Sequence, residues 1–257
     1  MPEYTHDDLM KIFRAKYGEP ENCGWSPRLR FRFHYFNPDD IYEAVLSEFV
    51  TEATTWLDVG CGRDIFPSNF QTAKVLASRC LLLVGLDPSD NIFGNPLLHE
   101  RVKGLIDDFH TDRQFDLITL RMVAEHITDP ERAVAALTRL VRLGGCVVVY
   151  TVFKWSPVTL VSAASPLGLH HAVKRAIWGT EEKDTFPTTY RMNTRSALAR
   201  LFGSAGFTEE SFQYLDDCRT FSKWKWLNTL ELLTWKALRW VGLHYPEVCL
   251  LGVYRKN

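Results

Sequence analysis

The chain has 257 residues, of which 46% are hydrophobic and 24% charged, and its formal net charge is −1 at pH 7. This length and apolar content are sufficient for one domain with a large core. The near-zero net charge argues against nucleic acid as a partner. No apolar run has the length of a membrane span, and the N-terminus lacks the basic and apolar regions of a secretory signal, so we expect a cytoplasmic protein.

The cysteines are scattered along the chain, and no Cys-x-x-Cys or Cys/His cluster has the spacing of a zinc site. Four of the six fall in or beside apolar runs. We therefore expect buried free thiols in a reducing compartment and no metal site. The six are Cys23, Cys61, Cys80, Cys146, Cys218 and Cys249.

The N-terminal residues 1–36 are expected to form an arm that precedes the core. A weakly periodic helix is predicted over residues 7–16. In residues 28–36, arginine alternates with apolar or aromatic residues, and this period of two predicts a strand or extended segment with one cationic face. Two interpretations remain open: an edge segment with solvated arginines, or a flap that meets an anionic group of a bound molecule.

A glycine-rich loop follows the first strong helix and strand signals. Asn37-Pro38-Asp39-Asp40 predicts the start of a helix that runs to about residue 50. Residues 55–59 read as a strand buried on both faces, in which the Asp58 carboxylate is costly unless it meets a partner. Gly60 and Gly62 then permit positive φ and the close approach of a ligand to the backbone.

Ile65 stands where a dinucleotide fingerprint requires its third glycine or an alanine, and no Gly-Lys-Ser/Thr of a phosphate loop follows. Downstream, strands and helices alternate, which predicts right-handed crossovers and a parallel sheet. In such sheets ligands bind at the carboxyl ends of the strands. The expected strands are 81–87, 101–106, 115–120 and 146–151, and the expected helices are 68–78, 130–141 and 194–205.

Five motifs in this stretch resemble those of the class I S-adenosylmethionine-dependent methyltransferases. They cover residues 40–151 well, and residues 194–256 resemble the family more loosely. One departure is Asp64, where many members have a third glycine. The motifs are Leu-Asp-Val-Gly-Cys-Gly (57–62), Val-Gly-Leu-Asp-Pro (84–88), Phe-Asp-Leu-Ile (115–118), Glu-His-Ile-Thr-Asp-Pro (125–130) and Leu-Gly-Gly-Cys-Val-Val-Val (143–149).

The resemblance implies an α/β fold with a doubly wound, mostly parallel sheet of seven strands. Its last strand would be antiparallel, with residues 209–215 and 247–254 as the closing pair. We expect one methyltransferase domain over 1–257, with a loop-rich segment where such enzymes insert a substrate lid. Its parts are the N-terminal arm or flap 1–36, the cofactor-binding core 37–151, the lid insertion 152–193 and the C-terminal part 194–257.

The resemblance also implies S-adenosyl-L-methionine as the cofactor. Asp87 ends the second strand and is placed to accept both ribose hydroxyls, and the alternative is a helix cap or a turn residue before Pro88. Ile106 and Asp107 stand where the adenine would lie, and two solvated acids in a turn are the alternative there. The full candidate set is Asp58, Gly60, Cys61, Gly62, Asp87, Pro88, Ile106, Asp107 and Arg121.

Methyl transfer from a sulfonium chiefly requires alignment and exclusion of water, and a hydroxyl acceptor is helped by a nearby base. His126, after the fourth strand, is the first candidate for that base, and the alternative is a histidine that caps the following helix. His170 and His171 in the lid are further substrate candidates. Tyr190 is expected to orient the substrate, and Arg191 to pair with a substrate carboxylate or phosphate, or with Asp184.

Residues 221–241 predict a long tryptophan-rich helix with an apolar stripe on one face and Lys225, Lys236 and Arg239 on another. Most such stripes belong to a core. The alternatives are a lid wall for a bulky apolar substrate and a contact with a membrane surface. The stripe consists of Trp226, Leu227, Leu230, Leu233, Ala237, Leu238 and Trp240.

The sequence thus predicts O-methylation of a small or medium-sized acceptor, with an apolar, natural-product or glycan-linked hydroxyl. Three alternatives remain: N- or C-methylation of a lipid-linked or membrane-associated acceptor, a nicotinamide oxidoreductase, and a non-catalytic cofactor-binding protein of the same fold. The oxidoreductase is disfavoured by Ile65.

Overall fold

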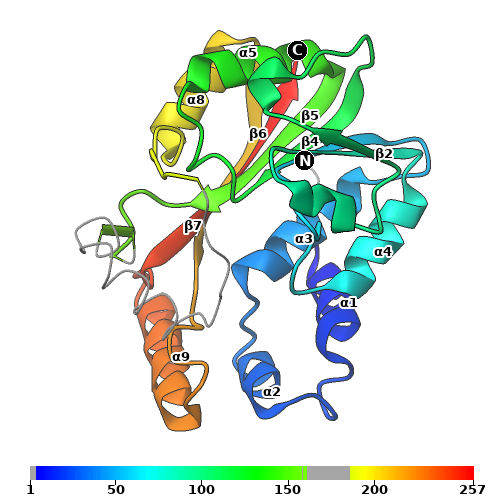
Figure 1. Cartoon of the computed structure of the whole chain (residues 1–257). Coiled ribbons are helices and arrows are strands. Elements are labelled where there is room, and N and C mark those ends of the chain that lie inside the picture. The colour runs from blue at the N-terminus through cyan, green and yellow to red at the C-terminus, as the bar shows by residue number, and fades with distance from the viewer. Residues whose placement is uncertain (1–3, 158, 161–185) are drawn as a thin grey trace.

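The computed structural model describes residues 4–157, 159–160 and 186–257. Its centre is a seven-stranded sheet of order β3-β2-β1-β4-β5-β7-β6 (Figure 1). Strands β1 to β5 are parallel, and β7 runs antiparallel to both of its neighbours. This confirms the predicted sheet. The strands are β1 Thr55–Val59, β2 Leu82–Asp87, β3 Glu100–Lys103, β4 Phe115–Arg121, β5 Val141–Val152, β6 Phe207–Asp216 and β7 Glu247–Lys256.

Helices cover both faces of the sheet, as a doubly wound fold requires. On one face, α3 (Pro38–Phe49) and α4 (Phe70–Arg79) pack on side chains such as Trp56 and Val148. On the other, α5 (Pro130–Leu140) and α8 (Arg195–Ser204) pack on Leu57, Val59 and their neighbours. Successive residues of a strand point to opposite faces, so the short apolar run of β1 supplies both cores at once.

The predicted helix starts are confirmed where a capping side chain precedes a proline or an acid. At the start of α3, Asp40 Oδ2 accepts from the Asn37 N–H at 3.0 Å, and at the start of α5, Asp129 accepts a hydrogen bond from the Arg132 N–H. A complete capping box opens α1 (His6–Tyr17), which packs on α3. These bonds satisfy backbone donors that have no partner inside a helix.

Residues 28–36 do not form the predicted strand. Helix α2 spans Trp25–Arg32, and the chain leaves it through His34 at a φ of 55°. The alternating pattern also contains an i, i+4 apolar pair, Leu29 and Phe33, which packs with Tyr35 against the cluster around Trp235. Tertiary packing therefore selects the helical period over the extended one.

The tryptophan-rich segment forms helix α9 (Lys225–Trp240), but the side that packs on the protein is not the predicted stripe. The buried side chains are Asn228, Glu231, Leu232 and Trp235. Asn228 Nδ2 donates to the Cys218 carbonyl at 2.9 Å, and Trp235 Nε1 donates to Asp216 Oδ2 at 2.8 Å. Long-range hydrogen bonds thus turn this side inward, so the interpretation of the apolar stripe as core is wrong.

Smaller differences concern boundaries. Strand β3 ends at Lys103, and Ile106 lies in the short 3₁₀ helix η2 (Ile106–Asp108). All six cysteines are buried and free, as expected. In the described part of the chain, no helix is long and apolar enough to cross a membrane. Of the predicted lid, residues 161–185 lie outside the described residues.

One buried carboxylate joins distant parts of the chain at the carboxyl edge of the sheet. Asp39, in the first turn of α3, accepts from Arg121 Nη2 at 3.1 Å and from Arg219 Nη1 at 3.0 Å. The Tyr150 hydroxyl donates to the same carboxylate at 3.3 Å. Burial raises the pKa of Asp39, but the two guanidinium groups outweigh burial and hold this pKa well below its usual range.

We predict that Asp39→Asn lowers the free energy of unfolding by about 3 kcal/mol at neutral pH, because two arginines lose a buried counter-charge. The folded-state pKa of Asp39 lies below its unfolded value, so its contribution is complete above about pH 4 and is lost as the pH falls below that value. Urea denaturation should show the two proteins converging in acid. Asp112→Asn, at an exposed position, serves as the control, and equal stabilities at neutral pH would contradict the prediction.

Candidate active site

The glycine loop after β1 has the backbone that the sequence predicts. Gly60 has a φ of 70° and Gly62 a φ of 50°. A Cβ on Gly60 would lie 2.2 Å from Val123 Cγ2, so the loop after β4 approaches the backbone at a distance that only glycine permits. A Cβ on Gly62 would meet nothing within 4 Å. Gly62 therefore has open space beside it.

Asp87 holds this loop in place from the end of β2. Its Oδ2 accepts from the Gly62 N–H at 2.9 Å, and its Oδ1 accepts from the Ser89 N–H at 2.7 Å. The bond to Ser89 spans the half-buried Pro88 and agrees with the interpretation of Asp87 as a turn residue. A carboxylate oxygen can accept more than one hydrogen bond, so Asp87 can hold the turn and bind a ligand at the same time.

Asp58 and Cys61 are buried beneath the loop. Asp58 Oδ1 accepts a hydrogen bond from Thr119 Oγ1 at 2.6 Å. Thr119 Oγ1 in turn accepts a hydrogen bond from Trp56 Nε1 at 2.7 Å. Burial raises the pKa of Asp58 to about 7, against the opposing hydrogen bond. The Cys61 sulfur lies 2.7 Å from where a Cβ on Gly85 would be. Both side chains support the loop from the core side.

An unsatisfied acceptor lies on η2. Asp107 Oδ1 is buried and has no hydrogen-bond partner among the described residues, and burial raises the pKa of this carboxyl. Ile106 beside it is buried. The alternative of two solvated acids holds only for Asp108, which is exposed and pairs with Arg132 Nη2 at 2.6 Å. A buried acceptor without a donor is rare and indicates a ligand or water at that position.

Arg121 ends β4, where its guanidinium is bound by Asp39 in the network described above. The pairing was not anticipated, because the two residues are 82 positions apart. The role of Arg121 at the cofactor stays a prediction.

His126 lies in the loop between β4 and α5, under the segment that returns to the core at residue 186. Its Nδ1 is 3.3 Å from the Pro187 carbonyl, and the edge of its ring faces Phe186. The side chain that caps α5 is Asp129, so the interpretation of His126 as the helix cap is wrong. The His126 residue is half-buried.

Glu125 fixes this returning segment, a role that the sequence analysis did not predict. Its backbone carbonyl accepts from the Thr189 N–H at 2.7 Å, and its Oε2 accepts from Thr151 Oγ1 at 2.6 Å. Asn193 Nδ2 donates to the same threonine oxygen at 2.8 Å. The sequence signal for this role was an acid in the loop after the fourth strand. Among the described residues, no group of three His, Cys, Asp or Glu side chains is arranged to hold a metal ion.

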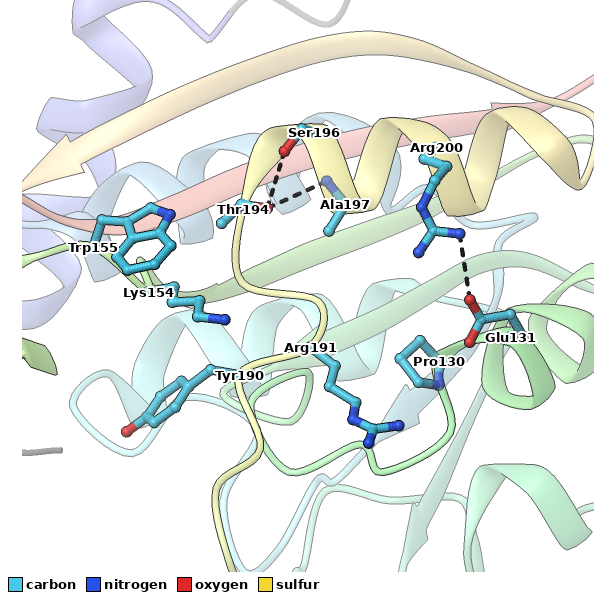
Figure 2. A pocket seen from close by; sticks show the side chains of 10 residues that line it. All are labelled: Pro130, Glu131, Lys154, Trp155, Tyr190, Arg191, Thr194, Ser196, Ala197 and Arg200. Carbon is cyan, nitrogen blue, oxygen red and sulfur yellow. Dashed lines mark hydrogen bonds and ion pairs between the residues drawn. The ribbon is translucent and has the colours of Figure 1, made fainter.

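Tyr190 and Arg191 line an open pocket of about 470 Å³ between the N-terminal ends of α5 and α8. Figure 2 shows it with Lys154 and Trp155 on one side and the Arg200–Glu131 pair on the other. Arg191 Nη1 donates to the Thr128 carbonyl at 2.9 Å. The glycine loop is not part of this pocket. His170, His171 and Asp184 lie outside the described residues.

Comparison with known proteins agrees with this geometry. A family model described as a methyltransferase domain matches residues 24–211. A ubiquinone biosynthesis O-methyltransferase of Thiobacillus denitrificans is 27% identical over 207 residues, which cover 76% of this chain and 82% of the relative. The protein of the same name from Nitrosomonas europaea is 26% identical over 206 residues, covering 76% and 81%.

Solved structures share the fold. An S-adenosylmethionine-dependent methyltransferase from Mesorhizobium loti superposes with a TM-score of 0.56 at 16% identity, covering 85% of this chain and 98% of its own. Geranyl diphosphate C-methyltransferase from Streptomyces coelicolor superposes with a TM-score of 0.54 at 15% identity, covering 95% and 88%. The family match over residues 24–211, together with the sheet order and the glycine loop, shows that the chain belongs to the class I S-adenosylmethionine-dependent methyltransferases.

Proposed function

We propose that the chain methylates a hydroxyl group of a small or medium-sized apolar acceptor, with His126 as the base. The observation that carries this proposal is the half-buried imidazole of His126 at the carboxyl edge of the sheet, one loop away from Gly60. The two relatives, which are 27% and 26% identical to this chain in sequence, are named O-methyltransferases, and this supports oxygen as the methylated atom.

The residues of the loop fit the methyl donor of the family. Bound S-adenosylmethionine supplies an electrophilic methyl group on a sulfonium. Asp87 keeps lone pairs for ribose hydroxyls, and the unpartnered Asp107 Oδ1 suits the amino group of an adenine. The open space beside Gly62 leaves the loop backbone accessible to the rest of the donor.

The contact with Pro187 supports a specific tautomer of His126. A carbonyl oxygen only accepts hydrogen bonds, so in the tautomer that we propose Nδ1 carries the hydrogen and donates a hydrogen bond to the Pro187 carbonyl. Nε2 then has the free lone pair that takes the proton of an acceptor hydroxyl. The orientation of a base by a second bond on its other nitrogen is a common feature of catalytic histidines.

For the acceptor, we propose contacts with Tyr190 and Arg191. Two N–H groups, those of Thr189 and Tyr190, bond the Glu125 carbonyl, and Tyr190 has a φ of 52°. This anchoring fixes the returning segment beside His126 and supports a positioning role for it. His170 and His171 stay predictions for the same role.

We predict that Asp87→Ala weakens the binding of S-adenosylhomocysteine by about 1–3 kcal/mol, because buried polar partners lose their acceptor. Isothermal titration calorimetry measures the loss, and Asp112→Ala is the matched control at an exposed acid. Gly60→Ala should remove binding, since its Cβ would collide with Val123. Unchanged affinity in Asp87→Ala would exclude Asp87 from the cofactor site.

We further predict that His126→Ala lowers the methylation rate by about 10²–10⁴-fold, the usual contribution of a general base, while S-adenosylhomocysteine affinity stays unchanged. His110→Ala, at an exposed histidine, is the control. The assay transfers a labelled methyl group to a panel of phenols, apolar alcohols, amines and activated carbon acids. Turnover of amines or carbon acids alone would refute O-methylation, and full activity in His126→Ala would refute the base.

A further inference from the structure

Helix α9 exposes the apolar stripe that the sequence suggested for the core. Its two terminal tryptophans are the most exposed, Trp226 at 69% and Trp240 at 87%, and Leu230 and Leu233 between them are 57% and 51% exposed. These residues recur on the side of the helix opposite Asn228, Leu232 and Trp235, which pack inward. An exposed apolar face of this extent on a soluble domain usually marks an interaction surface.

The charges around the stripe are of one sign. Between Cys218 and Glu247 the only acid is Glu231. That acid faces inward, where it accepts hydrogen bonds from Asn228 Nδ2 at 2.8 Å and from the Tyr245 hydroxyl at 3.1 Å. Lys225 and Lys236 are exposed and border the stripe on the helical wheel. The surface is thus apolar in its middle and cationic along one border.

This combination distinguishes between possible occupants. A second copy packed through the same face by a two-fold axis would bring Lys225 of one α9 near Lys236 of the other, with no exposed acid on either helix to compensate. An anionic lipid surface meets both features, because acyl chains accept the tryptophans and leucines while phosphates attract the lysines. The long lysine side chains reach the headgroups while their stems cover apolar surface.

The helix is also held firmly enough to act as a unit. Its inward side is joined to the sheet by the Trp235 bond to Asp216 at the end of β6, and by packing of Trp235 against Tyr35 after α2. In Figure 1, α9 extends from the ends of β6 and β7, at the carboxyl edge where the glycine loop lies. A bilayer on the outer side of α9 would therefore lie near this edge.

We propose that α9 docks the enzyme on an anionic bilayer, with its axis parallel to the surface and Trp226, Leu230, Leu233 and Trp240 inserted at the headgroup boundary. The docking itself is independent of the reaction. Its consequence, that an apolar acceptor is taken from the lipid, rests on the function proposed above.

The experiment is co-sedimentation of the full chain with phosphatidylcholine vesicles, with and without a fraction of phosphatidylglycerol. The wild type should pellet with the anionic vesicles and be released by high salt, since salt screens the lysines. Leu230→Ser with Leu233→Ser should lower the partition coefficient about tenfold or more, because two exposed apolar side chains lose their lipid contact. Lys225→Gln with Lys236→Gln should reduce binding to anionic vesicles by a similar factor, about tenfold.

The chain offers matched controls outside α9. Leu81→Ser with Leu143→Ser removes two leucines that are 65% and 71% exposed, and Lys74→Gln with Lys11→Gln removes two exposed lysines. Both control proteins should pellet like the wild type. Calorimetric titration with S-adenosylhomocysteine verifies that the α9 variants are folded, and it also separates a failure of docking from a failure of the proposed function.

Three results would overturn the proposal. The first is no pelleting of the wild type with anionic vesicles. The second is an equal loss of binding in the control variants. The third is a dimer in sedimentation velocity that the Leu230→Ser and Leu233→Ser pair dissociates, without any vesicle binding, which would make a second copy the occupant of this face.

Discussion

The carboxylate of Asp39 is the interaction on which the carboxyl edge of the sheet depends. It neutralises Arg121 at the end of β4 and Arg219 after β6, and Arg219 also binds Asp217 at 2.6 Å. Unpaired, either guanidinium would be costly to bury. With the pair formed, α3, β4 and the segment that leads to α9 are held in one arrangement, and the candidate active site is built against it.

The two sides of that site are fixed in different ways. The donor side depends on backbone geometry, since Gly60 must lack a Cβ for Val123 to approach and Asp87 must reach back to the Gly62 N–H. The side proposed for the acceptor depends on Glu125, which holds the returning segment through its backbone carbonyl and holds Thr151 through its side chain. His126 lies on the same loop as Val123, which approaches Gly60, and as Glu125. An alignment-dependent reaction benefits from such fixed positions.

Much of the fold and of the donor side could be predicted because the signals there are local. The helix start at Asn37 and the glycine loop follow from neighbouring residues, and the alternation of strands and helices implies the parallel sheet. The pairing of Arg121 with Asp39 and the role of Glu125 could not be foreseen, because they join residues that are far apart in the sequence. For Asp107, the sequence left open whether its carboxylate is solvated, and the structure adds that its Oδ1 atom is buried without a hydrogen-bond partner among the described residues.

Within residues 37–151, the sequence by itself determined which segments are helices and strands, their order and the place of the glycine loop, because short-range propensity and periodicity carry that information. The period of residues 28–36 and the orientation of α9 were decided only by tertiary structure. In both, the pattern is compatible with two arrangements. Packing of Leu29 and Phe33, and the bonds of Asn228 and Trp235 to residues outside α9, stabilise one of them. The apolar stripe is exposed because the opposite side of α9, with Asn228 and Trp235, forms the hydrogen bonds to the rest of the protein.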